Sequence, residues 1–129
     1  EYNLSSIKNV ATGGMSLSID LARLFKKKFN VQYLTILYGM SEAVLLSSKK
    51  YDLNKLDENM EGFSIGNLNP YIEYKVIDPK TGDIKSHNEA GELCLRGYIM
   101  IREYWKNPTK TKEQINLNGW FHTGDTVRM

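Results

Sequence analysis

Apolar residues between positions 18 and 30 recur every three or four positions, which is the spacing of one face of an α-helix. The residues on this face are Leu21, Leu24, Phe25 and Phe29. Ser18 is a residue type that caps helix N-termini, and Asp20 would lie in the first turn, where a negative charge is favourable. The pattern predicts an amphipathic helix over residues 18–30 with those four side chains buried.

A strand is expected on each side of this helix. The segment KNVATGG at residues 8–14 ends in two adjacent glycines, which allow a tight turn and a close approach of the backbone to its neighbour. The segment YLTIL at residues 33–37 is a continuous apolar run of the kind found in buried strands. Strand, turn, helix and strand in this order predict an α/β unit with parallel strands.

The pattern changes after this unit. Residues 47–70 are polar and show no sustained period, so they are expected to form a long loop. Apolar and polar residues then alternate, with Ile72, Tyr74 and Val76 on one face, and residues 91–97 form a further apolar stretch bounded by glycines. Both of these segments are predicted to be strands.

Turn signals separate the elements of this second half. Residues 78–82, DPKTG, indicate a turn, because proline fixes one φ angle and glycine permits a positive one. Pro108 suits the first position of a short helix. Residues 119–129 are expected to form a strand, a Thr-Gly-Asp turn and the start of another strand. The predicted fold class is therefore α/β followed by mainly β, the second part being a small antiparallel sheet or barrel.

Charge and composition narrow the range of functions. The chain has 129 residues and a net charge of +2, too small an excess to indicate nucleic acid or an anionic membrane as a partner. No run approaches the roughly 18 apolar residues of a transmembrane segment. Cys94 is the single cysteine, so an internal disulfide is excluded, and its apolar surroundings in sequence predict a buried structural thiol.

The segment YGMSE at residues 38–42 carries the most suggestive chemistry. Glu42 offers a hard carboxylate of the kind that Mg²⁺ prefers, and the Ser41 hydroxyl can donate a hydrogen bond to a phosphate. Tyr38 offers a flat face to a base, and Gly39 leaves room for a ligand to approach. The pentapeptide is compatible with a magnesium–nucleotide site and equally with an ordinary polar turn at the end of a strand.

Other polar positions are ambiguous by themselves. Asp125 follows a glycine, and one carboxylate can accept two hydrogen bonds from a ribose diol, although an aspartate in a Gly-Asp turn needs no ligand. The double glycine at 13–14 lacks the spacing of a dinucleotide or P-loop motif and could be a tight strand-to-helix connection. His87 and His122 have no third ligand at metal spacing and are interpreted as structural or solvent-facing.

The order of these segments carries more information than any one of them. The segments are ATGGMSLS, YGMSEA, GNLNPYIEYKVIDPKTG, GELCLRGYIMIREYW and GWFHTGD. In this order and at natural spacing they resemble the adenylate-forming enzymes: acyl-CoA synthetases, 4-coumarate–CoA ligases, beetle luciferases and peptide-synthetase adenylation domains. The resemblance runs from about Val10 to Met129. It looks most like the fatty-acyl-CoA synthetases, especially the medium-chain ones.

The resemblance implies a reaction and a set of site residues. Members join a carboxylic acid to AMP, release pyrophosphate, and usually pass the acyl group to coenzyme A. Ser41 would contact the AMP phosphate and Glu42 would bind Mg²⁺, as the catalytic pair. The cofactor-binding residues would be Gly13, Gly14, Met15, Tyr38, Gly39, Met40 and Asp125, with Tyr38 on the adenine and Asp125 on the ribose. Tyr38, Glu42 and Asp125 are expected to converge on one adenylate, and Ala43 and Val44 could line the acyl tunnel.

The resemblance also implies that this chain is an internal fragment of a large N-terminal domain. Residues 1–66 would end its α/β subdomain, and residues 67–129 would form a β-rich, barrel-like subdomain. The triphosphate-binding loop and the lysine-bearing C-terminal domain of the family are not recognisable here, so the fragment alone is expected to be inactive. Its partners would be ATP, coenzyme A, a fatty or other carboxylic acid, and the missing parts of the enzyme. An intracellular location is expected, with cytoplasm, mitochondrion and peroxisome left open.

Three departures from the family pattern stand out. Ser41 replaces the usual threonine and keeps the hydroxyl, while Met15-Ser16 replaces a small residue and a proline beside the double glycine. Arg102-Glu103 stands where a small residue and a glycine are usual, which indicates an altered turn if that glycine needs a positive φ. The alternatives are a luciferase-like or aryl-CoA ligase, a non-catalytic AMP-binding module or pseudoenzyme, and a generic α/β domain that matches by coincidence.

Overall fold

The computed structural model describes residues 3–57 and 59–129, which form two three-stranded sheets and three helical segments. The elements in chain order are β1 (Asn9–Gly13), α1 (Ile19–Phe29), β2 (Tyr33–Met40), β3 (Ala43–Asp52), the 3₁₀ turn η1 (Leu53–Lys55), β4 (Ile72–Ile77), β5 (Ala90–Gly97), α2 (Pro108–Gln114) and β6 (Phe121–Arg128). Neither α-helix has the length and apolar character that a bilayer crossing requires.

The chain divides into two compact units, residues 1–69 and residues 70–129. The first contains β1, α1, β2, β3 and η1, and the second contains β4, β5, α2 and β6. The predicted fold class, α/β followed by mainly β, is confirmed. Each unit has its own sheet and is described by itself below.

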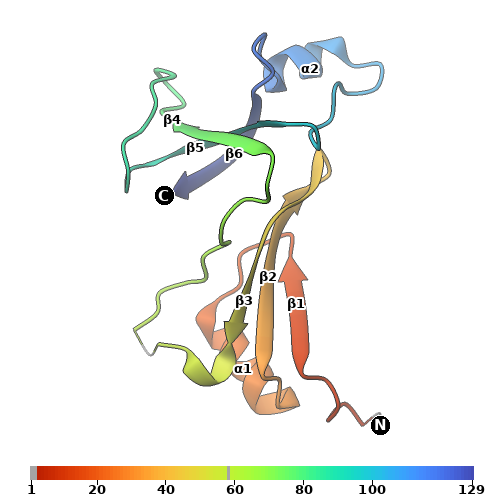
Figure 1. The fold of residues 1–129 in the computed structure, drawn as a ribbon, viewed down its shortest axis with the longest axis vertical. Coiled ribbons are helices and arrows are strands. Elements are labelled where there is room, and N and C mark those ends of the chain that lie inside the picture. Colours follow the sequence, from red (N-terminus) through yellow and green to blue (C-terminus); the bar gives the residue numbers. More distant parts are fainter. Residues whose placement is uncertain (1–2, 58) are drawn as a thin grey trace. The chain divides into compact units, whose positions relative to one another are not determined.

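The first sheet has the strand order β1-β2-β3. β1 pairs with β2 in parallel, as predicted, and β2 pairs with β3 as an antiparallel hairpin (Figure 1). The parallel register sets Asn9 opposite Tyr33 and Gly13 opposite Leu37. Both strands therefore end at the same edge of the sheet, and β2 continues three residues past the tip of β1.

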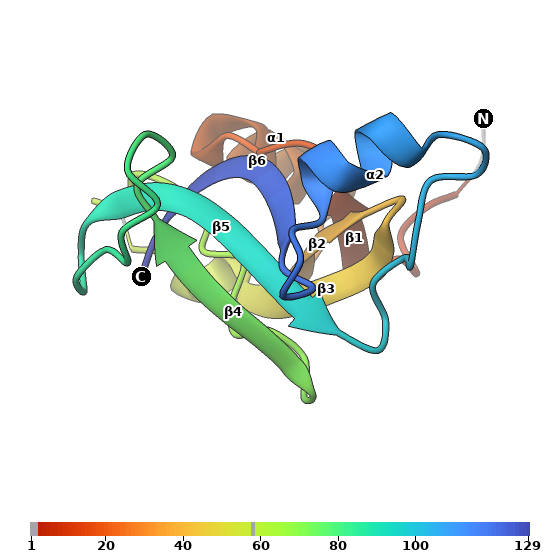
Figure 2. The same ribbon diagram turned by 90° about the horizontal axis from the view of Figure 1, so that it is seen from above.

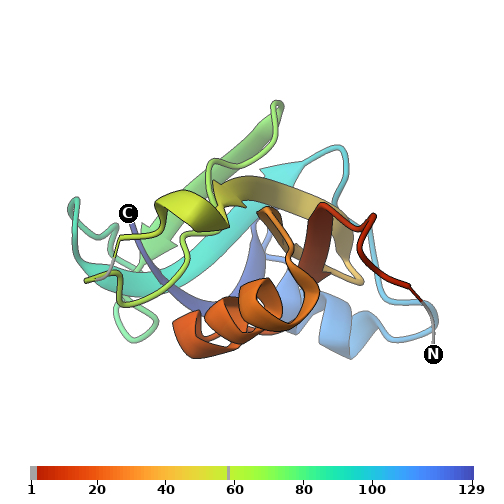
Figure 3. The ribbon, with the colours of Figure 1, turned by 90° about the horizontal axis from the view of Figure 1, so that it is seen from below.

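Helix α1 covers one face of this sheet (Figure 3). The Ser18 hydroxyl caps it by accepting a hydrogen bond from the Leu21 backbone N–H at 3.2 Å, as predicted. The predicted buried face is wrong in part, because Leu21 is 42% and Leu24 is 55% exposed. Ile19 and Ala22 are the buried residues of the helix instead. Successive residues of an α-helix are rotated by about 100° around its axis. When the side of the helix with Ala22 faces the sheet, the neighbouring Leu21 therefore points away from it.

The apolar core of the first unit lies between α1 and the sheet. Its fully buried members are Ala22, Val31, Leu34, Ile36 and Leu53. Partly buried side chains pack around them, among them Phe29 at the end of α1 and Phe63 in the loop after η1. This cluster holds the helix on the strands that carry the candidate site.

The long loop predicted for residues 47–70 is wrong in its first part. β3 extends to Asp52 and η1 follows it, so strand pairing with β2 overrides the polar composition. Residues 48–50 are polar because they are exposed. The remainder runs beside β3: the buried Ser47 hydroxyl donates to the Ile65 carbonyl at 2.9 Å, and the Asn69 backbone N–H donates to the Leu46 carbonyl at 2.8 Å. Residue 58 lies outside the described residues.

The second sheet is antiparallel throughout, with β5 between β4 and β6 (Figure 2). Its buried side chains are Val76, Ile77, Leu93, Cys94, Leu95 and Phe121. The predicted β4 face is wrong in part, because Tyr74 is 51% exposed while Ile77 is buried. The predicted turn at residues 78–82 is confirmed by a hydrogen bond from the Gly82 N–H to the Asp78 carbonyl. Helix α2 begins at Pro108, as predicted.

Candidate functional site

The YGMSE segment lies at the tip of the β2–β3 hairpin. The sequence predicts a strand that ends at Leu37. In the structure, β2 continues through Tyr38, Gly39 and Met40. Ser41 and Glu42 alone form the turn into β3. Ser41 is exposed, and Tyr38 and Glu42 are half-buried. A tight hairpin therefore carries the serine and the glutamate in its two-residue turn.

The double glycine lies at the same edge of the first sheet. Gly13 pairs with Leu37, so Gly14 and Met15 leave β1 next to the point where Tyr38 continues β2 (Figure 1). Met15 is 83% exposed. Carboxyl ends of parallel strands are the usual ligand-binding edge of an α/β sheet. The hairpin turn lies farther along, about 10 Å beyond Leu37 at about 3.3 Å for each strand residue.

Two of the glycines are required by backbone packing. A Cβ atom at Gly39 would lie 2.2 Å from the Val44 carbonyl oxygen, and one at Gly13 would lie 2.8 Å from the Leu37 carbonyl oxygen. Both distances are shorter than any real contact. Space for a ligand is therefore not needed to explain Gly39, because β3 already fills the place of its side chain. Gly14 differs, since its φ of +86° favours glycine and the space around it is open.

Glu42 fits the requirements of a magnesium ligand. Mg²⁺ is commonly held by one or two carboxylates, with waters and substrate phosphates completing its six ligands. Glu42 is a hard carboxylate on a partly exposed turn, which leaves room for those other ligands. Ala43, which the resemblance placed beside the acyl tunnel, is buried, whereas Val44 is 87% exposed. Of these two residues, only Val44 offers an apolar side chain to a ligand.

Asp125 lies in the second unit, within a strand and not in a turn. β6 runs unbroken from Phe121 to Arg128, so the predicted Thr-Gly-Asp turn is wrong. In β5, Glu92 pairs with Thr126 and Cys94 pairs with His122. One β5 residue therefore faces three β6 residues, 123–125, and these three form a bulge. Asp125 is exposed on this bulge. The expected convergence of Tyr38, Glu42 and Asp125 on one adenylate stays a prediction.

Side chains hold the bulge in place. The Thr123 hydroxyl donates to the Leu93 carbonyl at 2.7 Å and accepts from the Asp125 backbone N–H at 3.0 Å. The Glu92 carboxylate accepts from the Gly124 backbone N–H at 3.1 Å through Oε1. The extra residues of the bulge therefore find hydrogen-bond partners that the regular ladder does not supply.

Sequence reasoning missed a cluster of three side chains beside this bulge. Glu92, Cys94 and His122 have ligand atoms within 4.8 Å of one another, which corrects the reading that His122 has no further ligand near it. The sequence contains one signal for this cluster, a Glu-x-Cys pattern in a predicted strand, because residues two apart in a strand lie on the same face. Cys94 is fully buried, as predicted, and burial raises the pKa of its thiol to about 11, with the Glu92 charge adding to the shift.

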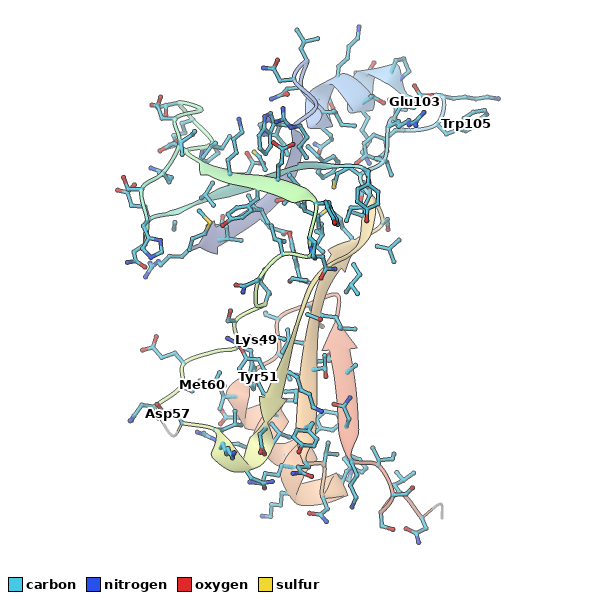
Figure 4. The ribbon with its side chains drawn as sticks, in the orientation of Figure 1. Lys49, Tyr51, Asp57, Met60, Glu103 and Trp105 are labelled. Atoms are coloured by element: carbon cyan, nitrogen blue, oxygen red, sulfur yellow. The ribbon has the colours of Figure 1, made fainter. Side chains whose placement is uncertain are left out.

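The Arg102-Glu103 departure leaves an ordinary backbone at Glu103. The non-glycine residues with positive φ do not include Glu103, and in this region the positive angle falls on Lys106, at 52°. Glu103 and Trp105 lie in the segment before α2 (Figure 4), and Trp105 is 82% exposed. The left-handed residue of this region is thus Lys106, and nothing in the structure gives Arg102-Glu103 a function.

Comparison with known proteins gives a consistent result. The family described as AMP-binding enzyme matches residues 1–105. The chain is 35% identical to luciferin 4-monooxygenase of Photuris pensylvanica over 97% of its length and 36% identical to 4-coumarate–CoA ligase 1 of Arabidopsis thaliana over 97%. It is 30% identical to the mitochondrial medium-chain acyl-CoA ligase ACSF2 of Bos taurus over 99%. The matched parts cover 22%, 22% and 20% of these proteins, so the chain spans about a fifth of the length of its curated relatives.

Solved structures agree with this result. The structure of McyG A-PCP complexed with phenylalanyl-adenylate matches 99% of this chain and 24% of its own, with a TM-score of 0.80 and 27% identity. ATP-bound MatB from Rhodopseudomonas palustris matches 92% of this chain and 22% of its own, with a TM-score of 0.74 and 26% identity. The family match extends over most of the chain, and the relatives align from one end of it to the other. The chain belongs to the AMP-binding enzyme family.

Proposed function

We propose that the protein to which these residues belong activates a carboxylic acid with ATP. The acid and ATP would form an acyl-adenylate and pyrophosphate, and the acyl group would then pass to the thiol of coenzyme A. The family match and the relatives named as CoA ligases support this reaction. The observation that carries the proposal is the common sheet edge where the segment from Gly13 to Met15 meets the segment that begins at Tyr38.

In the first unit, each residue has a role that its position suits. Tyr38 would lie against the adenine, and the backbone of Gly13 and Gly14 would border it together with Met15. Ser41, exposed at the hairpin tip, would donate a hydrogen bond to the α-phosphate. Joining two anions requires their charges to be neutralised and the phosphate to be held in line with the attacking carboxylate.

Glu42 would hold Mg²⁺ next to Ser41. A bound Mg²⁺ supplies charge neutralisation for the phosphates during adenylation. The contribution of the chain is to keep this carboxylate on a two-residue turn whose strands are fixed by pairing and by the close approach at Gly39. The turn therefore fixes the backbone positions from which the hydroxyl and the carboxylate extend.

In the second unit, Asp125 would accept hydrogen bonds from the ribose hydroxyls. An exposed aspartate on a bulge held by Thr123 and Glu92 suits this role, because hydrogen bonds fix the backbone that carries it. This assignment is independent of the roles proposed in the first unit.

A fatty acid, in particular one of medium chain length, is the proposed substrate. The resemblance of the GELCLRGY and NGWFHTGD segments and the match to ACSF2 over 99% of the chain support it. An aryl acid is the second candidate, supported by the 36% identity to a 4-coumarate–CoA ligase. Acyl-adenylate formation from octanoate and from a cinnamate by the full-length protein separates the two. Faster turnover of the cinnamate would reject the fatty-acid proposal.

The 129 residues alone are proposed to be inactive, because they span about a fifth of their relatives. Pyrophosphate release is measured with octanoate and ATP, for this chain and for the full-length protein. Release is expected from the full-length protein only. The ligase proposal would be rejected if the full-length protein released no pyrophosphate and also showed no heat on titration with a non-hydrolysable acyl-adenylate mimic. The protein would then be a non-catalytic module.

Substitutions test the site residues in the full-length protein. Glu42→Gln and Asp125→Asn are each expected to lower kcat/KM for pyrophosphate release by about a hundredfold, the usual size for one lost charge-stabilising contact. Glu61→Gln is the matched control, since Glu61 is an exposed loop residue of the first unit. If the Glu42→Gln variant had the same kcat/KM as the wild type at limiting Mg²⁺, Glu42 would be excluded as the metal ligand.

A further inference from the structure

Three potential metal ligands come together on two neighbouring strands of the second unit. Glu92 and Cys94 are two residues apart on β5, so their side chains share one face of the sheet. Cys94 pairs directly with His122 of β6. The strand register thus assembles a carboxylate, a thiol and an imidazole without any loop. Apart from the hydrogen bond by which Glu92 holds the bulge that carries Asp125, the function proposed above does not use this cluster.

The separations of the ligand atoms suit a tetrahedral ion. Cys94 Sγ lies 3.6 Å from His122 Nδ1, and His122 Nδ1 lies 3.2 Å from Glu92 Oε2. Zinc bonds of about 2.3 Å to sulfur and about 2.0–2.1 Å to nitrogen and oxygen at tetrahedral angles give about 3.5 Å between sulfur and nitrogen and about 3.3 Å between nitrogen and oxygen. The observed distances are close to both values. The third separation, between the thiol sulfur and the carboxylate, is within 4.8 Å, so an ion that enters would have to draw these two ligands together by at most about 1.3 Å.

The carboxylate has an outer contact that would orient it toward an ion. Glu92 Oε1 accepts a hydrogen bond from the Gly124 backbone N–H, which leaves Oε2 facing the imidazole. Ligating carboxylates are commonly held by such a second hydrogen bond. The Glu92 side chain is 16% exposed and the His122 side chain 30%, whereas Cys94 is fully buried. The cluster is therefore closed on the thiol side and open to solvent on the other.

We propose that Glu92, Cys94 and His122 form a binding site for a divalent transition-metal ion of the zinc class. The ligand atoms would be Oε2, Sγ and Nδ1, and a water molecule would occupy the fourth position on the open side. Thiolate and imidazole ligands select zinc-like ions over Mg²⁺, which prefers oxygen. Binding replaces the thiol proton by the metal and releases that proton to solvent. Its three ligands are different residues from Glu42, for which a magnesium ion is proposed above.

Cobalt titration of the full 129-residue chain tests the site directly. Co²⁺ occupies zinc sites, and coordination by a thiolate produces a charge-transfer absorption in the near ultraviolet. Because Cys94 is the single cysteine, such a band identifies it as a ligand. We expect the band to appear with one equivalent of Co²⁺ and to be removed by Zn²⁺ but not by Mg²⁺.

Substitutions identify the other two ligands. His122→Gln and Glu92→Gln are each expected to weaken Co²⁺ affinity at least about tenfold. His87→Gln is the matched control, because His87 is the other histidine of the chain and is exposed in the connection between β4 and β5. Circular dichroism confirms that each variant is folded before titration.

Two results would overturn the proposal. One is the absence of a charge-transfer band in the folded wild-type chain, and the other is equal Co²⁺ affinity for the wild type and a folded His122→Gln. Either result would leave the cluster as a hydrogen-bonded Glu–His pair beside a buried thiol. The readout is metal binding and not enzymatic activity, so it is independent of the adenylation proposal.

Discussion

The β2–β3 hairpin of the first unit and the β5–β6 pair of the second contain the same irregularity in pairing. In the first, the single residue Gly39 faces the three residues 44–46, because Tyr38 pairs with Ser47 and Met40 with Ala43. In the second, the single residue Leu93 faces the three residues 123–125. Each bulge carries a residue predicted for the nucleotide site.

The two bulges are fixed in opposite ways. At the first, a side chain must be absent, since the Val44 carbonyl occupies the place of a Gly39 Cβ. At the second, side chains must be present, since the Thr123 hydroxyl and the Glu92 carboxylate bind the displaced backbone. The comparison shows that one backbone irregularity can be specified by steric exclusion or by polar contacts. The two kinds respond differently to mutation and to pH.

Gly39→Ala is expected to have the largest effect. The new Cβ would lie 2.2 Å from a backbone oxygen, so the backbone of one of the two strands must shift to accommodate it. We expect a loss of at least about 3 kcal/mol in the free energy of unfolding, as for other strained backbone positions. Urea denaturation followed by far-ultraviolet circular dichroism measures it.

Two further glycines serve as controls for this change. Gly124→Ala in the second bulge meets no atom within 4 Å but has a φ of +73°, so about 1 kcal/mol is expected. Gly62→Ala has open space and no positive φ, so its effect should be close to zero. Equal losses at positions 39 and 124 would contradict the view that steric exclusion fixes only the first bulge.

Glu92→Ala is expected to have an intermediate effect. It removes an acceptor from the Gly124 N–H and the partner of His122. Loss of such contacts at a mostly buried carboxylate costs about 2 kcal/mol. Both tryptophans, Trp105 and Trp120, lie in the second unit, so tryptophan fluorescence during urea denaturation reports this unit.

Glu103→Ala is the matched control, because Glu103 is exposed in the same unit (Figure 4). Its effect should be within about 0.5 kcal/mol. A Glu92→Ala chain as stable as the Glu103→Ala chain would mean that the second bulge is not held by the carboxylate.

The smallest effect is expected from pH, again through polar contacts of the second unit. Asp78 Oδ2 lies 2.8 Å from Lys85 Nζ, and this hydrogen bond lowers the pKa of the Asp78 carboxyl below its ordinary value of 3.8. A lowered pKa stabilises the fold above 3.8, and this contribution is lost as the pH falls through the folded-state value. Both side chains are partly exposed, so the effect is small.

Asp78→Asn isolates this contribution, since the amide oxygen can still accept from the Lys80 N–H within the turn. The wild type should melt at a slightly higher temperature than the variant at pH 7, and the difference should shrink as the pH falls below 3.8. A difference in Tm that stays constant down to pH 2 would exclude the carboxylate charge as its source.

Local signals in the sequence predicted most of the elements. Ser18, Pro108 and the segment 78–82 act on their immediate neighbours, so their cap, helix start and turn were read correctly. The two parallel strands followed from the order of strand, helix and strand. The extent of β3 could not be predicted, because its polar residues are held in a strand by the β2 partner and not by their own pattern.

The sequence by itself determined most of the elements, the family and the chemical types at the candidate site, because these depend on residue identity and short spacing. Only the tertiary structure decided that the 123–125 segment is a bulge, that Val44 requires Gly39, and that Glu92 and Cys94 meet His122. These features depend on strand register, which joins residues about 30 positions apart in the β5–β6 pair and five positions apart at Gly39 and Val44. A local pattern of apolar residues indicates which face a strand buries, but it does not say which residue of the partner strand lies opposite or where a bulge occurs.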